Sequence, residues 1–303
     1  MIPKELFQNV RRIEISTKRL VTDVFAGQYH SVFKGQGMEF DEVREYQIGD
    51  DIRTIDWNVT ARTGRPHIKK YVEERELTVM LLVDASASCR FATVKQLKSR
   101  LAAEVAATLA FSAVKNNDKV GLIIFTDKVE KFIPPRKGLG HVLRVIREVL
   151  YFEAKGRSTD IIHALEYFNK VTTRKSVGFI VSDFFASKTE DHTNNNLKKT
   201  LNMTNRRHDM IAVTLNDPAE MNLPNCGLME LEDAETGQKI LIDSSDNNFL
   251  EQYRRRASER INKREALFSS VGMDHVDLST NTPFVQELIK FFLKRRKKIS
   301  LRR

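Results

Sequence analysis

Cysteine is scarce in this chain of 303 residues, which contains only Cys89 and Cys226. The two lie 137 positions apart, and neither has a neighbour in a CxxC or CxxH pattern. A disulfide framework needs several cysteine pairs, and a structural zinc site needs clustered cysteine and histidine ligands. The sequence therefore predicts neither of these.

Long apolar runs are also missing, because no stretch of 18 or more consecutive apolar residues occurs. A transmembrane helix needs about 20 such residues, so the sequence predicts none. The start of the chain, MIPKELFQNVRRIEIS, is too charged to form the apolar centre of a signal peptide. We therefore expect a cytoplasmic protein.

The excess of positive charge, +10 in total, is concentrated at one end of the chain. The stretch from Lys294 to Arg303, KRRKKISLRR, carries seven basic groups and no acid, which leaves 43 basic and 40 acidic groups elsewhere. Such a tail is usually a solvated helix end, although an anionic membrane, RNA or an acidic protein surface would also attract it. Aromatic residues that could stack on bases are not interleaved there, so we expect no specific nucleic-acid partner.

From residue 77 onward, apolar runs alternate with helical patterns. Helices are predicted from about Val94 to just before Asn116, at 138–152 and at 160–172. The third strand is short and is predicted to end at Pro134 and Pro135. The alternation predicts an α/β fold, with a doubly wound, mainly parallel sheet of six strands. These strands are expected at 77–84, 119–125, 129–133, 176–183, 209–217 and 275–280.

Two stretches break this alternation. Residues 228–244 read as a β-hairpin insertion with its turn at Glu235, Thr236 and Gly237, followed by a charged helix at about 247–270. The first 75 residues contain a possible helix at 3–16 and then a Gly-rich, polar segment without clear periodicity. We place a domain boundary near Glu76, between an N-terminal region at 1–76 and a larger domain at 77–303.

Oxygen-bearing side chains follow two of the predicted buried strands. Asp84, Ser86 and Ser88 alternate after the first strand, and Asp183 closes the fourth. If the six strands, numbered along the chain, are arranged in the order 3-2-1-4-5-6, the first and fourth strands are neighbours. Thr159 lies at the start of the helix that precedes the fourth strand, and it would join the same group. Such ligands suit Mg²⁺ or Mn²⁺. Taken singly, Ser88 could instead cap a helix and Asp84 could form a turn.

These residues resemble the metal-ion-dependent adhesion site of von Willebrand factor A domains, with DxSxS after an apolar strand, a later Thr, and an Asp closing the next buried strand. The segment GQGMEFDEVREYQIGDDIRTIDWNVTARTGRPHIKKYVEERELTVMLLVDASAS resembles the bacterial family known as domain of unknown function fifty-eight. The resemblance covers nearly the whole chain. It implies a von Willebrand factor A-like, Rossmann-like fold and genes that commonly lie beside those of MoxR-type AAA+ ATPases.

The resemblance also implies roles for the site residues. Ser86, Ser88 and Thr159 would bind the metal directly, while Asp84 and Asp183 would act mainly through water. One coordination position would stay open for an Asp or Glu of a partner protein. The chain departs from the family pattern in three places: Cys89 stands where Met is common, GRST replaces GGT, and SDFF lacks the usual Gly. None removes a ligand, but Arg157 beside the site could weaken cation binding or bind the partner carboxylate.

A second group of acids lies in the N-terminal region. Asp50, Asp51 and Asp56 could act as an acid and base pair or as a further metal cluster. The alternative is structural: a turn at Gly49, local salt bridges, and Trp57 anchoring the segment on the large domain. We favour the structural interpretation because no nucleophile or histidine is near these acids in sequence.

Three functions stay open at this point. The first is a non-enzymatic, metal-dependent adaptor that presents a client to a MoxR-type AAA+ ATPase. The second is a metal-dependent phosphoryl or ester hydrolase with Asp84 as nucleophile, although Ser86 breaks the DxD pattern such enzymes use and no GxSxG or P-loop motif occurs. The third is binding of an anionic surface through the basic tail.

Overall fold

The computed structural model describes residues 27, 29, 32, 33, 39–72, 76–93, 96–185 and 191–300. The helix expected at 3–16 lies outside this part of the chain, as does Val94, where the first helix of the large domain was expected to begin.

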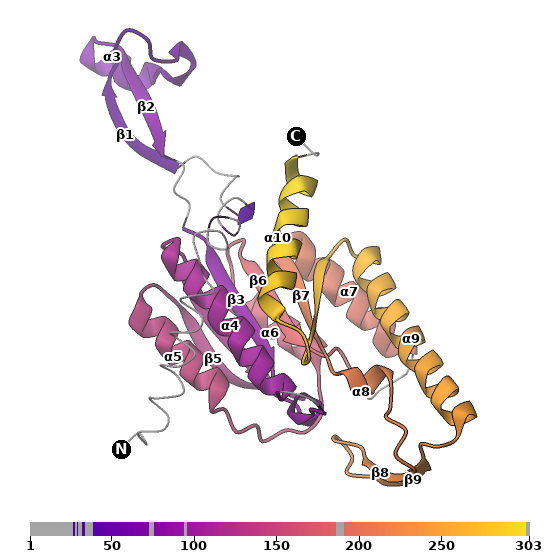
Figure 1. Cartoon of the computed structure of the whole chain (residues 1–303). Helices are drawn as coiled ribbons and strands as arrows, with labels where there is room; N and C mark the ends of the chain where they lie inside the picture. The colour runs from indigo at the N-terminus through magenta and orange to yellow at the C-terminus, as the bar shows by residue number, and fades with distance from the viewer. Residues whose placement is uncertain are drawn as a thin grey trace, which may run out of the picture.

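A six-stranded sheet forms the centre of the molecule (Figure 1). Its strands run in the order β10-β7-β6-β3-β4-β5, and all neighbours are parallel except β4 and β5. This is the predicted order 3-2-1-4-5-6, so the fold-class prediction is confirmed. The strands are β3 (Thr78–Asp84), β4 (Lys119–Phe125), β5 (Val129–Arg136), β6 (Val177–Ser182), β7 (Asp209–Asn216) and β10 (Asp274–Ser279).

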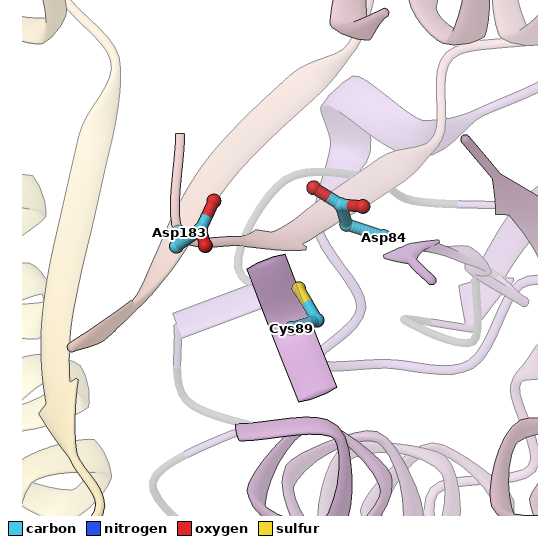
Figure 2. Close-up of side chains that lie close together, drawn as sticks. All are labelled: Asp84, Cys89 and Asp183. Carbon is cyan, nitrogen blue, oxygen red and sulfur yellow. The ribbon is translucent and has the colours of Figure 1, made fainter. Parts of the chain in front are cut away.

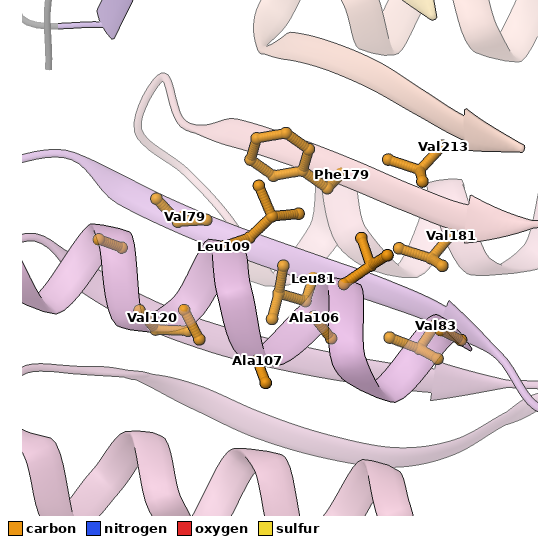
Figure 3. Packing of buried hydrophobic residues seen from close by; sticks show 14 of the residues in the cluster. Val79, Leu81, Val83, Ala106, Ala107, Leu109, Val120, Phe179, Val181 and Val213 are labelled. Atoms are coloured by element: carbon orange, nitrogen blue, oxygen red, sulfur yellow. The ribbon is translucent and has the colours of Figure 1, made fainter. Parts of the chain in front are cut away.

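Helices cover both faces of this sheet. On one face lie α4 (Lys98–Lys115), α5 (Leu139–Leu150) and α10 (Phe284–Ser300). On the other lie α6 (Ile161–Val171), α7 (Asp191–Arg207) and α9 (Asn247–Ser270). Successive residues of a strand point to opposite faces, which explains why β3 is apolar throughout. Figure 3 shows Val79, Leu81 and Val83 of β3 packed on the α4 side.

Strand β5 is longer than predicted, because it continues through Pro134 and Pro135 to Arg136. Proline lacks the N–H that a central strand must donate, but β5 lies at the edge of the sheet and pairs only with β4. The register between the two strands also shifts at this point, between the pairs Val120 with Arg136 and Leu122 with Ile133. The edge position and the bulge together accommodate both prolines.

The N-terminal region contains regular structure that its sequence pattern did not indicate. Strands β1 (Glu39–Glu45) and β2 (His67–Val72) form a separate antiparallel pair. Between them lie the short 3₁₀ helix η1 (Ile52–Thr54) and the helix α3 (Trp57–Thr63). Figure 1 shows this unit, residues 39–72, standing apart from the six-stranded sheet. The predicted boundary near Glu76 falls between β2 and β3, and it stays a prediction.

The predicted hairpin insertion is present as β8 (Leu228–Glu232) and β9 (Lys239–Asp243). Its turn needs a left-handed residue, which Gly237 supplies with a φ of +72°. The short helix α8 (Pro218–Met221) precedes the hairpin, and the predicted charged helix follows it as α9. Among the described helices, none has both the length and the apolarity that crossing a bilayer requires.

Candidate metal site at the ends of β3 and β6

Asp84 and Asp183 lie at the same edge of the sheet because β3 and β6 are parallel neighbours. Asp84 is the last residue of β3, and Asp183 follows the last residue of β6. Their side chains are only 2% and 1% exposed. The structure therefore brings these two predicted residues together in a buried position.

Both carboxylate oxygens of Asp84 accept hydrogen bonds. Oδ1 accepts from the Ser86 backbone N–H at 2.9 Å, and Oδ2 accepts from the Ser182 hydroxyl at 2.6 Å. The hydrogen bond from the Ser86 N–H closes a local turn, as expected if Asp84 serves to form a turn. Burial and the nearby charge of Asp183 raise the pKa of Asp84 to about 6. Ser182, which sequence reasoning did not single out, thus becomes part of the site.

Cys89 adds a sulfur to these oxygens. It lies in the short 3₁₀ helix η2 (Ala87–Arg90) and is fully buried. Its Sγ and one carboxylate oxygen each of Asp84 and Asp183 lie within 4.8 Å of one another. Figure 2 shows the sulfur pointing toward the space between the two carboxylates. Burial, reinforced by the two carboxylates, raises the pKa of the Cys89 thiol.

Ser86 and Ser88 bring two hydroxyl groups together beside Asp84, with their Oγ atoms 3.0 Å apart. Ser86 is fully buried, and it precedes η2 without capping it through its side chain. Ser88 lies inside η2, so the alternative in which it caps the following helix is wrong. The two hydroxyls are therefore available to share a ligand.

Thr159 lies in the loop that leads into α6. Its hydroxyl oxygen is buried and has no hydrogen-bond partner among the described residues. The Ala87 backbone N–H donates to the Arg157 carbonyl at 3.0 Å, and this bond ties the Thr159 loop to the serine loop. Burying a hydroxyl without a partner costs about 1–3 kcal/mol, and a hydrogen-bond donor or a bound cation would offset this cost.

Close contacts at Gly156 hold the loop that carries Thr159. A Cβ at this position would lie 2.0 Å from Asp127 Oδ1 and 2.3 Å from Thr126 Oγ1, so these side chains would have to move to admit one. Glu130 accepts hydrogen bonds from the Lys155 and Gly156 backbone N–H groups. The Gly of GRST thus permits this close approach, while Arg157 next to it is exposed.

Lys98 is the site residue that sequence reasoning missed most clearly. It begins α4, is 0% exposed, and places its Nζ 2.9 Å from Asp183 Oδ2 and 2.5 Å from Glu220 Oε1. Burial opposes its charge, but the two carboxylates outweigh burial and raise the pKa of Lys98 to about 12. With all of them ionised, Asp84, Asp183 and Glu220 outnumber Lys98 by two charges, which favours a further cation.

A cavity of about 690 Å³ opens onto the site between η2, α4 and the end of α5. Asp84, Ser86 and Cys89 line one part of it, and the partly exposed Leu97 and Tyr151 line another. Arg90, Arg100 and Glu153 also line it, and Arg100 pairs with Glu104 at 3.3 Å.

The acids of the N-terminal region have structural partners. Asp50 pairs with Arg44 at 2.7 Å, which lowers the pKa of Asp50. Asp51 caps η1, and Asp56 caps α3. The structural interpretation of these acids fits, but one part of it is wrong. Trp57 is 69% exposed and does not anchor the region on the large domain, because α3 packs on β2 within its own small unit.

Some of the basic side chains of the C-terminal tail form ion pairs within the large domain. Arg295 is buried in α10 and pairs with Asp209, with its NH2 nitrogen 2.5 Å from Asp209 Oδ1. Lys298 pairs with Asp274 at 2.7 Å. The described part of the tail is therefore the end of a packed helix, and two of its cations already have partners.

Comparison with known proteins places the chain in a family. The family described as "Protein of unknown function DUF58" matches residues 42–263. The chain belongs to this family. It is 28% identical over 290 residues to the uncharacterized protein Rv1480 of Mycobacterium tuberculosis, covering 95% of this chain and 89% of that one. The uncharacterized protein YeaD of Bacillus subtilis is 25% identical over 140 residues, covering 46% of this chain and 33% of that one.

Solved structures with similar folds include BatB from Bacteroides thetaiotaomicron, at a TM-score of 0.46 and 14% identity, covering 73% of this chain and 99% of that one. The VWA domain of SpRpn10 matches at a TM-score of 0.38 and 11% identity, covering 71% of this chain and 94% of that one. The match of the family model over residues 42–263 confirms the predicted family, while its association with MoxR-type ATPases stays a prediction.

Proposed function

We propose that this protein is a metal-dependent protein-interaction module in which a Mg²⁺ or Mn²⁺ ion, held in the crevice at the ends of β3 and β6, accepts an Asp or Glu of a partner protein. Ser86, Ser88 and Thr159 bind the ion directly, and Asp84 and Asp183 support it through hydrogen bonds. When bound, the ion supplies an open, electrophilic position for the partner carboxylate.

Two observations carry this proposal: the buried pair of carboxylates, Asp84 and Asp183, and the unpartnered Thr159 hydroxyl, whose loop is hydrogen-bonded to the serine loop through Ala87 and Arg157. A cation would satisfy the hydroxyl oxygen and offset the excess negative charge at the same time. The serine hydroxyls, 3.0 Å apart, offer two more oxygen ligands of the kind that these hard ions take. The residues present therefore fit the ion that the family resemblance implies.

The arrangement favours binding over hydrolysis. A nucleophilic Asp84 would need a free oxygen facing the substrate, but both of its oxygens accept hydrogen bonds and the side chain is 2% exposed. Asp183 accepts hydrogen bonds from Lys98 and from the Phe185 backbone N–H. Glu220 accepts from Lys98 and from the Asp217 backbone N–H. None of these three carboxylates is placed as a general base would be.

The partner we propose is a MoxR-type AAA+ ATPase or a client protein of that ATPase, and we place the complex in the cytoplasm, where ATP is supplied. The partner class comes from the family resemblance, and the chemistry of its contact comes from the site. A partner carboxylate would enter through the cavity, where the exposed Arg90, which lies in η2, is a cation that could pair with it.

The test is binding of the purified protein to a MoxR-type ATPase from the same genome, in Mg²⁺ and in EDTA. We expect EDTA and Thr159→Ala to weaken the complex at least about tenfold, since each removes part of the bond to the partner carboxylate. Thr173→Ala is the matched control, because Thr173 is exposed and lies beyond the end of α6, away from the site. Binding that is the same in EDTA would contradict the proposal.

A further inference from the structure

The hairpin formed by β8 and β9 has one face whose side chains are all exposed. Cross-strand partners lie on the same face of a two-stranded sheet, and successive residues alternate between its two faces. The exposed face consists of the pairs Leu228 with Asp243, Glu230 with Leu241, and Glu232 with Lys239. Leu228 is 72% exposed and Leu241 is 71% exposed, so two large apolar side chains on this face are open to solvent.

The rest of the hairpin is anchored, so this face is held in place. Its opposite face packs on a small apolar cluster made by Leu223, Ile242 and Leu250. At the turn, the Ser158 hydroxyl donates to the Glu235 carboxylate at 3.0 Å. A partner that binds the exposed face therefore meets a preformed surface and does not have to order it.

Acidic residues surround the two leucines. Residues 228–243 contain five acids and one base, a net charge of −4 in a chain whose total is +10. On the exposed face, Lys239 pairs with Glu230 at 2.7 Å, while Glu232 and Asp243 have no ion pair among the described residues. A surface that is apolar at its centre and negative at its rim complements a basic segment that contains apolar residues.

The chain itself carries a segment of this chemistry. Residues 294–303 have seven basic groups, no acid, and two apolar residues, Ile299 and Leu301. The hairpin and this segment are thus stretches of opposite charge that both contain apolar side chains. Each one has the features that the other would bind.

The two stretches lie at opposite ends of the molecule (Figure 1). Arg295 and Lys298 pair with Asp209 and Asp274, the first residues of β7 and β10, whereas the hairpin turn contacts the loop at the other end of the sheet. The eight residues of β7 span about 25 Å, and the five residues after Lys298 reach at most about 18 Å. The C-terminal segment therefore does not reach the hairpin of its own molecule.

We propose that the exposed face of the β8–β9 hairpin binds the basic C-terminal segment, residues 294–303, of a second copy of this chain. Leu228 and Leu241 contact the apolar residues of that segment, and Glu232 and Asp243 pair with its basic groups. The contact joins two different surfaces, so repetition of it gives a ring or an open filament of copies. This inference goes beyond the proposed function and needs no metal ion.

The first test is sedimentation velocity of the full chain over a range of concentrations, with EDTA present throughout. We expect association that weakens at least about tenfold between 0.1 M and 1 M salt, because the screening length falls from about 10 Å to about 3 Å. Leu241→Ala should weaken association at least about tenfold, because it removes an apolar side chain from the centre of the contact. Leu139→Ala is the matched control, since Leu139 is also exposed but begins α5.

The second test uses one variant of each surface. Glu232→Arg alters the hairpin, and the double change Lys294→Glu, Arg296→Glu alters exposed positions of the C-terminal segment. Each variant alone should stay monomeric, because it carries only one intact surface. An equal mixture of the two should form a complex of one copy of each and nothing larger, because a single intact contact remains in the mixture. Circular dichroism verifies that both variants are folded.

Several results would overturn the inference. A wild-type chain that is monomeric at every concentration in 0.1 M salt would mean that this face does not bind the segment. Association that is equally strong in Leu241→Ala would place the contact elsewhere. Failure of the mixture to form the one-to-one complex would exclude a head-to-tail contact. The proposed function does not depend on these results, because its test compares Mg²⁺ with EDTA and uses Thr159→Ala.

Discussion

Lys98 connects the candidate metal site to the segment that follows β7. Its ammonium group bridges Asp183, at the end of β6, and Glu220, in α8. Glu220 in turn accepts from the Asp217 backbone N–H, and the Asp217 carboxylate accepts from the Thr280 hydroxyl at 2.7 Å. A chain of buried polar contacts therefore runs from the site to the end of β10. In such a network the loss of one member leaves the others unpaired.

We predict that Lys98→Met lowers the free energy of unfolding by about 3–5 kcal/mol, because it leaves Asp183 and Glu220 buried without their counterion. Lys290→Met is the matched control. Lys290 pairs with Glu287 at 2.8 Å on the exposed face of α10, and the loss of such a pair costs less than about 1 kcal/mol. Urea denaturation of both variants measures the difference. Equal stability of the two variants would mean that the buried pair contributes no more than a surface one.

The acids of the site could be predicted from the sequence, and several of its other groups could not. Asp84 is the last residue of β3 and Asp183 directly follows β6, so their place follows once the strand order is known. Lys98 left a weaker signal, since it lies three and seven residues before the buried Leu101 and Val105 on the same face of α4. A charge on an apolar face predicts a buried partner, but the pattern does not say which one. Glu220 is 122 residues away from Lys98.

At the scale of elements, β3 is the strand that positions the site. It is the central partner of β4 and β6, and its end carries Asp84 into the crevice. Its residues after Thr78 are buried, so the strand is held from both faces as well as from both edges. Burial of each such aliphatic side chain contributes about 1.5–3 kcal/mol.

We predict that Leu82→Ala destabilises the protein by about 2–5 kcal/mol, because it opens a cavity between β3 and the helices of the α6 face. Leu241→Ala is the matched control in β9, where the side chain is 71% exposed and its loss should change stability by less than about 0.5 kcal/mol. Thermal unfolding of both variants provides the comparison. A small effect at Leu82 would show that the centre of the sheet tolerates loss of packing.

The sequence predicted best those elements whose apolar residues follow a clear pattern. Continuous apolar runs predicted the buried parallel strands, and apolar residues spaced by three or four predicted α4, α5 and α6. By contrast, β1 has the sequence EFDEVRE, in which charged residues replace the apolar run that would predict a strand. This strand pairs with β2 alone. The length of β5 was underestimated for a similar reason, because prolines are excluded from central strands but tolerated at an edge.

At the scale of the whole molecule, the N-terminal unit and the candidate metal site lie at different ends of β3. The unit at 39–72 precedes the amino end of this strand, and the site follows its carboxyl end. Seven residues of strand span about 20 Å. A single partner that contacted both would therefore have to reach along the sheet. The exposed side chains of Ile52 and Trp57 would be its second contact.

The central claim is that the crevice at the ends of β3 and β6 holds a divalent cation. The most direct measurement is the uptake of Mn²⁺ by the purified protein, followed by electron paramagnetic resonance of the free ion. We predict uptake of one ion per chain by the wild type and by Thr173→Ala, and loss of this uptake in Thr159→Ala, which removes the unpartnered hydroxyl. Wild-type protein that leaves all of the Mn²⁺ free, or Thr159→Ala protein that binds it equally well, would contradict the account.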